Sequence, residues 1–156
     1  MPQNNDCANG ITLNISMAGG RPVAFSTTNA TYSGGIPLCD IADYLDLFYT
    51  FNAPKDTVTM EIPGISGNIG FYGLFDACPG SGIEVECGRM LVFSGATYIF
   101  TNLIIGKDYF LQILFIPGAA ETDQEICLQS TIGQTALSCP SSTDVSDVGT
   151  NLPNQS

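Results

Sequence analysis

The amino-acid sequence predicts an all-β protein: an antiparallel β-sandwich, jelly-roll-like and stapled by disulfides. Apolar and polar residues alternate with a period of two in several short segments, and glycine or proline interrupts the chain between them. Six cysteines and no histidine add the expectation of disulfides. No segment shows the capped, amphipathic pattern of a helix. Short strands joined by turns favour a sandwich or a jelly roll.

The segment YLDLFYTF, residues 44–51, shows the alternation most clearly. One face carries Leu45, Leu47, Tyr49 and Phe51, and the other carries Tyr44, Asp46, Phe48 and Thr50. Segments 57–62 and 108–115 are similarly rich in β-branched and aromatic residues. Turn residues such as Pro54 and Gly106 separate these segments, so we expect each of them to form one strand.

The segment GLFDACPGSGIEVECG, residues 73–88, predicts a β-hairpin. A strand over 68–77 turns at CPGSG and returns through 83–87. We therefore expect Cys78 and Cys87 to form a disulfide that closes the end of the hairpin. A loop of this size contributes up to about 3 kcal/mol by restricting the unfolded chain.

The other four cysteines predict two long-range disulfides. Cys7 precedes the first strand pattern and Cys127 lies within the last, and the ends of a sandwich often run side by side, so we expect Cys7 to pair with Cys127. Cys39 and Cys139 then pair by elimination. The spacing of the cysteines fits neither a zinc finger nor an iron–sulfur or thioredoxin-type motif.

The charge balance limits the classes of partner. Fifteen acidic residues against four basic ones give a net charge of −11. Nucleic acids and anionic membranes would be repelled, because binding them depends on lysine and arginine. Disulfides indicate an oxidising compartment, so we expect an extracellular or cell-surface location.

The ends of the chain suggest a mature protein or an excised module. The N-terminus has no signal-peptide pattern, and no apolar stretch approaches the roughly 20 residues that span a bilayer, so we expect no membrane insertion. We expect one β-sandwich module over 1–137. Residues 138–156 are predicted to be a polar tail or linker, anchored near its start by Cys139.

The sequence argues against catalysis. Glu84 and Glu86 are two residues apart on one predicted strand, so we expect them to point the same way and not to flank a glycosidic bond. A serine triad lacks its histidine, and no phosphate-binding loop occurs. We interpret the protein as non-catalytic, with a glycoside hydrolase as a distant alternative.

The sequence contains candidate residues for two kinds of binding site, a calcium site and a glycan-binding surface. Asp40 and Asp43, in CDIADYLD, are candidate calcium ligands, although turn capping explains them equally well. No other cofactor is expected. Exposed aromatic rings commonly stack on sugars, while most aromatics of a sandwich fill its core. The candidates for a glycan platform are Tyr44, Phe48, Phe71, Tyr72 and Tyr98.

The segments NDCAN, at residues 5–9, and DLFYTF, at residues 46–51, carry a family resemblance. They resemble parts of a Cys-containing β-sandwich module of Bacteroidetes surface and secreted proteins exported by the type IX route, which is similar to bacterial pre-peptidase C-terminal domains. The resemblance covers about 4–130. NDCAN, residues 5–9, corresponds to the family's Asn-Asp-x-Cys-x-Asn-Ala opening, and DLFYTF, residues 46–51, to its Asp-Val-Trp-Tyr-x-Phe strand. The family's acidic run is missing after Cys87, and its second-strand cysteine is missing from 15–25.

The resemblance implies a non-catalytic role in a larger adhesin-like protein. We expect a structural or adhesive module, such as one repeat of an appendage, with a carbohydrate-binding accessory module as the alternative. The implied partners are neighbouring domains, further copies of the chain, or glycans. A self-associating module is consistent with a chain that has few lysines to protect its strand edges.

Overall fold

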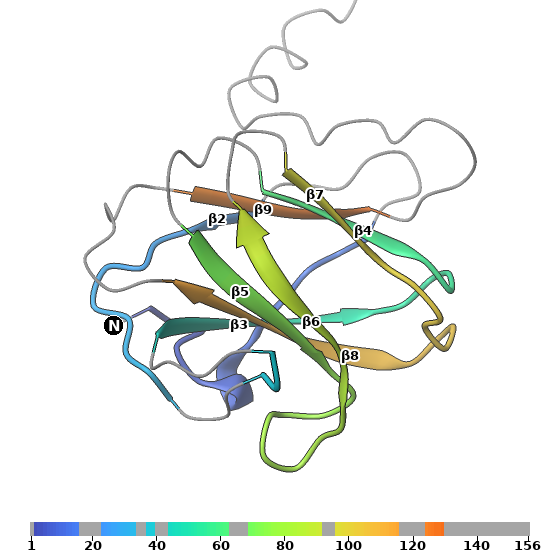
Figure 1. Ribbon diagram of the computed structural model, residues 1–156, viewed down its shortest axis with the longest axis horizontal. Helices are drawn as coiled ribbons and strands as arrows, with labels where there is room; N and C mark the ends of the chain where they lie inside the picture. The colour runs from blue at the N-terminus through green and yellow to red at the C-terminus, as the bar shows by residue number, and fades with distance from the viewer. Residues whose placement is uncertain are drawn as a thin grey trace, which may run out of the picture.

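The computed structural model describes residues 2–15, 23–33, 37–39, 44–62, 69–91, 96–115 and 124–129. Over these residues the chain forms two sheets that pack face to face (Figure 1). One sheet has five strands in the order β1-β3-β8-β5-β6, and the other has four in the order β2-β9-β4-β7. The predicted β-sandwich is confirmed.

The strands have the following bounds. The five-stranded sheet contains β1 (Ile11–Thr12), β3 (Leu45–Asn52), β8 (Asp108–Phe115), β5 (Ile69–Phe75) and β6 (Glu84–Leu91). The four-stranded sheet contains β2 (Val23–Phe25), β9 (Gln124–Gln129), β4 (Val58–Ile62) and β7 (Ala96–Phe100). A single 3-10 turn, η1 (Cys7–Asn9), precedes β1 within the described residues. Neighbouring strands are antiparallel, except that β1 runs parallel to β3.

The main core lies between the two sheets. Leu47, Tyr49 and Phe51 of β3 point into it and are at most 1% exposed, as the period-two pattern predicts. The Phe51 ring lies 6.4 Å from the ring of Phe100 on the opposite sheet and 5.8 Å from the ring of Tyr109 on β8, measured between ring centroids. Aromatic side chains from both sheets therefore fill the interior.

A second, smaller core lies on the outer face of the five-stranded sheet. Phe48, Gln112 and Leu114 point away from the main core, yet each is at most 1% exposed. Described parts of the chain before β3 lie against this face: Asn4 hydrogen-bonds to the backbone of Phe48, and Pro37 lies over Gly73. Cys7 in η1 forms a disulfide with Cys78 in the β5–β6 turn, so the N-terminal segment reaches across this face.

The predicted hairpin is present, but the predicted staple is wrong. β5 and β6 pair antiparallel, and Cys87 lies opposite Gly73, five positions before Cys78. Because Cys78 lies in the turn, it is too far along the hairpin to face Cys87. Cys87 instead forms a disulfide with Cys39.

The Cys7–Cys127 and Cys39–Cys139 pairings are therefore also wrong. Cys127 is disulfide-bonded, but not to Cys7. The neighbours of Cys127 on β9, Ile126 and Leu128, belong to the main core, so Cys127 points to the outer face of the four-stranded sheet. The N-terminal segment packs on the opposite side of the sandwich, which separates Cys7 from Cys127.

Some sequence-based predictions fall on residues outside those that the structure describes. These are the calcium candidates Asp40 and Asp43, the cysteine Cys139, the domain boundary at 137 and the tail over 138–156. Within the described ranges, no helix has the length and apolar character needed to cross a membrane.

Candidate functional site

The predicted aromatic platform does not form. Phe48 is 1% exposed and belongs to the smaller core, and Tyr72 is 7% exposed and contacts the main core, so neither is available to stack on a sugar. Tyr72 lies on the inner face because it alternates with Phe71 along β5. Its hydroxyl donates to Glu86 Oε1 at 3.1 Å, and burial beside this carboxylate raises the pKa of Tyr72 to about 12.

The other three aromatic candidates are half-buried and belong to two separate pairs. Tyr44 stacks on Phe71, with ring centroids 5.7 Å apart, on the outer side of the five-stranded sheet. Tyr98 packs against Tyr72, with ring centroids 5.3 Å apart, on the inner side. The five candidates therefore do not converge on one surface.

Glu84 and Glu86 lie on opposite faces of the sheet, which corrects the expectation that they point the same way. The register shifts within the hairpin, so that Leu74 pairs with Glu86 and Phe75 pairs with Glu84. This bulge leaves Val85 as the extra residue and reverses the alternation. Glu84 accepts a hydrogen bond from the backbone of Leu38, whereas Glu86 accepts one from Tyr72.

The buried carboxylate of Asp46 has a structural role in the smaller core. Ser33 donates to it from both its backbone N–H and its hydroxyl, and Gln112 Nε2 donates at 3.0 Å. Burial raises the pKa of Asp46 above the ordinary value, and these hydrogen bonds partly oppose that shift. Among the described residues, no group of three or more His, Cys, Asp or Glu side chains is arranged to hold a metal ion.

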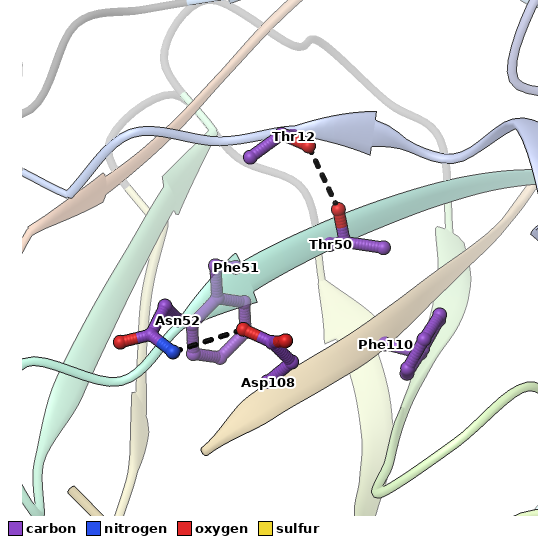
Figure 2. A pocket seen from close by; sticks show the side chains of 6 residues that line it. All are labelled: Thr12, Thr50, Phe51, Asn52, Asp108 and Phe110. Atoms are coloured by element: carbon purple, nitrogen blue, oxygen red, sulfur yellow. Dashed lines mark hydrogen bonds between the residues drawn. The ribbon is translucent and has the colours of Figure 1, made fainter. Parts of the chain in front are cut away.

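An open hollow lies on the outer face of the five-stranded sheet (Figure 2). It has a volume of about 290 Å³, close to the lower limit of roughly 300 Å³ for small-molecule pockets. Strands β1, β3 and β8 supply its lining residues, which are Thr12, Thr50, Phe51, Asn52, Asp108 and Phe110.

The strand register explains why these side chains meet. Thr50 pairs with Phe110, and Asn52 pairs with Asp108, so the four side chains form two neighbouring rows on the outer face. β1 pairs with the same stretch of β3 and places Thr12 beside Thr50. Phe110 is half-buried and contributes an apolar ring to the hollow.

Hydrogen bonds hold the polar side chains of the hollow in place. Asn52 Nδ2 donates to Asp108 Oδ1 at 2.9 Å and to the carbonyl of Gly106 at 2.8 Å. The hydroxyls of Thr12 and Thr50 are 3.1 Å apart and share one hydrogen bond. Figure 2 shows the Thr12–Thr50 and Asn52–Asp108 pairs side by side, with the Phe110 ring beyond Asp108.

Sequence reasoning missed this hollow. The period-two pattern places Thr50 and Asn52 on the outer face, but it does not reveal which part of that face stays open. The Cys7–Cys78 and Cys39–Cys87 disulfides hold segments of the chain against this face, and neither disulfide was predicted from the sequence. A usable signal was the polar pair Asn52 and Asp108, which lie at the end of one strand segment and the start of another.

The fold defines a disulfide-linked β-sandwich with a small hollow on one outer sheet face. A family model described as galactose-binding domain-like and associated with type IX secretion matches residues 3–127. The chain belongs to this family. The type IX association and the disulfides indicate an envelope or extracellular location.

The other comparisons are less informative. The crystal structure of Aeromonas hydrophila PliG, a periplasmic inhibitor of g-type lysozyme, is 19% identical with a TM-score of 0.41, and the match covers 76% of this chain and 91% of that chain. At this low score the likeness bears on neither the fold nor the ligand. No curated protein sequence matches the chain significantly.

Proposed function

We propose that this chain is a non-catalytic, extracellular accessory module that binds a sugar in the hollow and so attaches a larger surface or secreted protein to a glycan. One observation carries the proposal: the half-buried ring of Phe110 lies beside the polar groups of Thr12, Thr50, Asn52 and Asp108. A sugar ring has an apolar face that stacks on an aromatic ring and hydroxyls that need polar partners. The family's galactose-binding-like description supports this class of ligand.

The arrangement of carboxylates favours binding over hydrolysis. Glycosidases place two carboxyl groups on either side of the scissile bond, roughly 5–9.5 Å apart. The hollow is lined by one carboxylate, Asp108, and the Glu84 and Glu86 carboxylates lie on opposite faces of another strand. We therefore propose that a sugar bound in the hollow is held without being cleaved.

A structural or adhesive repeat is the second candidate, and the strand edges favour it. β6 and β7 are the last strands of their sheets. Both carry exposed apolar residues, with Val85 42% and Ile99 54% exposed. Edges of this kind are prone to pair with a neighbouring copy of the chain. Light scattering that finds monomer alone at high concentration would remove this candidate for the isolated module.

A glycan array, run with and without calcium, tests the sugar-binding proposal. We expect saturable binding of neutral glycans by the full chain. Replacing Phe110 by alanine should weaken that binding at least tenfold, because stacking on this ring is lost. Ile99→Ala is the matched control, since it also removes an exposed apolar side chain but from the opposite sheet.

The outcomes separate the two candidates. Binding lost in Phe110→Ala and kept in Ile99→Ala supports the hollow as the site. Absence of binding to every glycan, together with ordered self-association, contradicts the sugar-binding proposal and supports a structural repeat. Binding that requires calcium but is unaffected by Phe110→Ala would place the site elsewhere, for example near Asp40 and Asp43.

A further inference from the structure

We infer that the hollow selects its ligand by hydrogen-bond donors: it favours a sugar that carries an ammonium group over a neutral sugar, and it rejects a sugar that carries a carboxylate. This inference rests on the proposed function, and it adds the charge class of the ligand. The reason is that most hydrogen-bond donors of the hollow already bind other groups of the protein, whereas several acceptors do not.

Asn52 offers no free donor to the hollow. Its amide nitrogen donates to Asp108 Oδ1 and to the carbonyl oxygen of Gly106, and neither of these atoms carries a hydrogen to donate. Two such acceptors fix the orientation of the amide, because a flipped side chain would bring its oxygen against both of them. Both N–H groups are therefore used, so Asn52 has no N–H left for a ligand, and its Oδ1 atom points away from Asp108 (Figure 2).

Asp108 presents a carboxylate without a cationic partner in the described part of the chain. Its exposed side chain accepts from Asn52 through one oxygen, which leaves the second oxygen for a ligand. The neighbouring Lys107 turns away, with its Nζ atom 3.1 Å from Asp76 Oδ2. The negative charge of Asp108 is therefore not neutralised by the adjacent lysine.

The two threonines add little donor capacity. Thr12 and Thr50 each have one hydroxyl hydrogen, and one of the two is used in their mutual hydrogen bond. One hydroxyl hydrogen remains for a ligand, whereas Asp108 and the threonine oxygens offer several acceptors. A ligand must therefore supply most of the donors, as sugar hydroxyls and ammonium groups do. A carboxylate supplies none and is repelled by Asp108.

The test uses the full chain and three sugars of different charge: galactose, galactosamine and galacturonate. Binding is measured by NMR titration at low and high salt. We expect galactosamine to bind about three- to tenfold more tightly than galactose, as an exposed charge-assisted contact allows, with the difference shrinking in high salt. Galacturonate should bind at least several-fold more weakly than galactose.

Two variants with the same change in net charge complete the test. Asp108→Asn should abolish the preference for galactosamine over galactose, because it removes the charge while an asparagine oxygen can still accept from Asn52 Nδ2. Asp56→Asn, on an exposed residue outside the hollow, should leave the order of the three sugars unchanged. Equal affinity for the three sugars, or equal effects of the two variants, would overturn the inference while leaving sugar binding intact. Failure of all three sugars to bind would contradict the proposed function as well.

Discussion

Cys87 lies directly opposite Gly73 on the paired strand and forms a disulfide with Cys39. Gly73 has no side chain. The segment that the disulfide holds lies close over this glycine. A Cβ atom on Gly73 would be 2.7 Å from the Cγ atom of Pro37 and 2.6 Å from the Cε2 atom of Phe75. Close packing of 37–39 against β5 therefore depends on the missing side chain.

Replacing Gly73 by alanine should destabilise the protein. The added methyl group must displace Pro37 or the Phe75 ring, and overpacking of this kind costs typically about 1–3 kcal/mol. Urea denaturation gives the free energy of unfolding. Gly10→Ala is the control, because its nearest contact would be 3.3 Å away, on the Thr50 side chain, and we expect a smaller loss. Equal stability of Gly73→Ala and the parent protein would contradict the packing described here.

Non-reducing peptide mapping should find Cys7 linked to Cys78 and Cys39 linked to Cys87. Cys127 is also disulfide-bonded, and Cys139 is the one cysteine of the sequence left to pair with it. We therefore expect a peptide that links Cys127 to Cys139. A peptide that joined Cys78 to Cys87 would restore the hairpin staple and contradict the structure.

The disulfide between Cys39 and Cys87 should contribute substantially to stability. The two residues are separated by 48 positions, and closing a loop of that length stabilises the fold by about 4 kcal/mol in the chain-entropy model. A variant with serine at both positions should have a correspondingly lower free energy of unfolding. An unchanged midpoint of denaturation would show that the bridge does not restrict the unfolded chain as expected.

The strands were predictable from the sequence, but the disulfides and the hollow were not. The period-two alternation of side chains along 44–51 assigns each residue to one face of the strand. It correctly predicted that Leu47, Tyr49 and Phe51 share one face. It does not distinguish a covered outer face from an open one, so the burial of Phe48 was not foreseen. The bulge at Val85 depends on pairing between strands, which is why the separation of Glu84 from Glu86 was also missed.

Two phenylalanines on the outer face should differ in their effect on stability. Phe48 is 1% exposed, so Phe48→Ala should cost about 3–5 kcal/mol. Phe110 is only half-buried beside the hollow, so Phe110→Ala should cost clearly less. Urea denaturation of both variants measures this difference. Equal losses would show that Phe110 belongs to the smaller core, and would weaken its assignment to ligand binding.

The buried carboxylate of Asp46 should make stability depend on pH. Its pKa in the folded protein is raised above the unfolded value, mainly by burial. The folded state therefore binds a proton more readily than the unfolded state, and protonation favours folding. As the pH falls from neutral through the folded-state pKa towards 3.8, the parent protein should gain stability relative to Asp46→Asn.

Urea denaturation of the two proteins between neutral pH and pH 4 measures this effect of Asp46. The comparison with Asp46→Asn is needed because other carboxyls act in the opposite direction. The pKa of Asp76 is lowered by hydrogen bonds from Ile83 and Lys107, so its contribution is lost as the solution becomes acidic. A difference between the two proteins that stayed constant with pH would contradict the described environment of Asp46.

Sugar binding in the hollow is tested most directly by an NMR titration of the isotope-labelled full chain with galactose. We predict that the backbone amide signals of Thr12, Thr50, Asn52, Asp108 and Phe110 shift together and saturate with one dissociation constant. The signals of the β5–β6 turn over 76–82, which supplies no lining residue of the hollow, should not move. Saturable shifts confined to any other surface, or no saturable shifts at all, would contradict the claim.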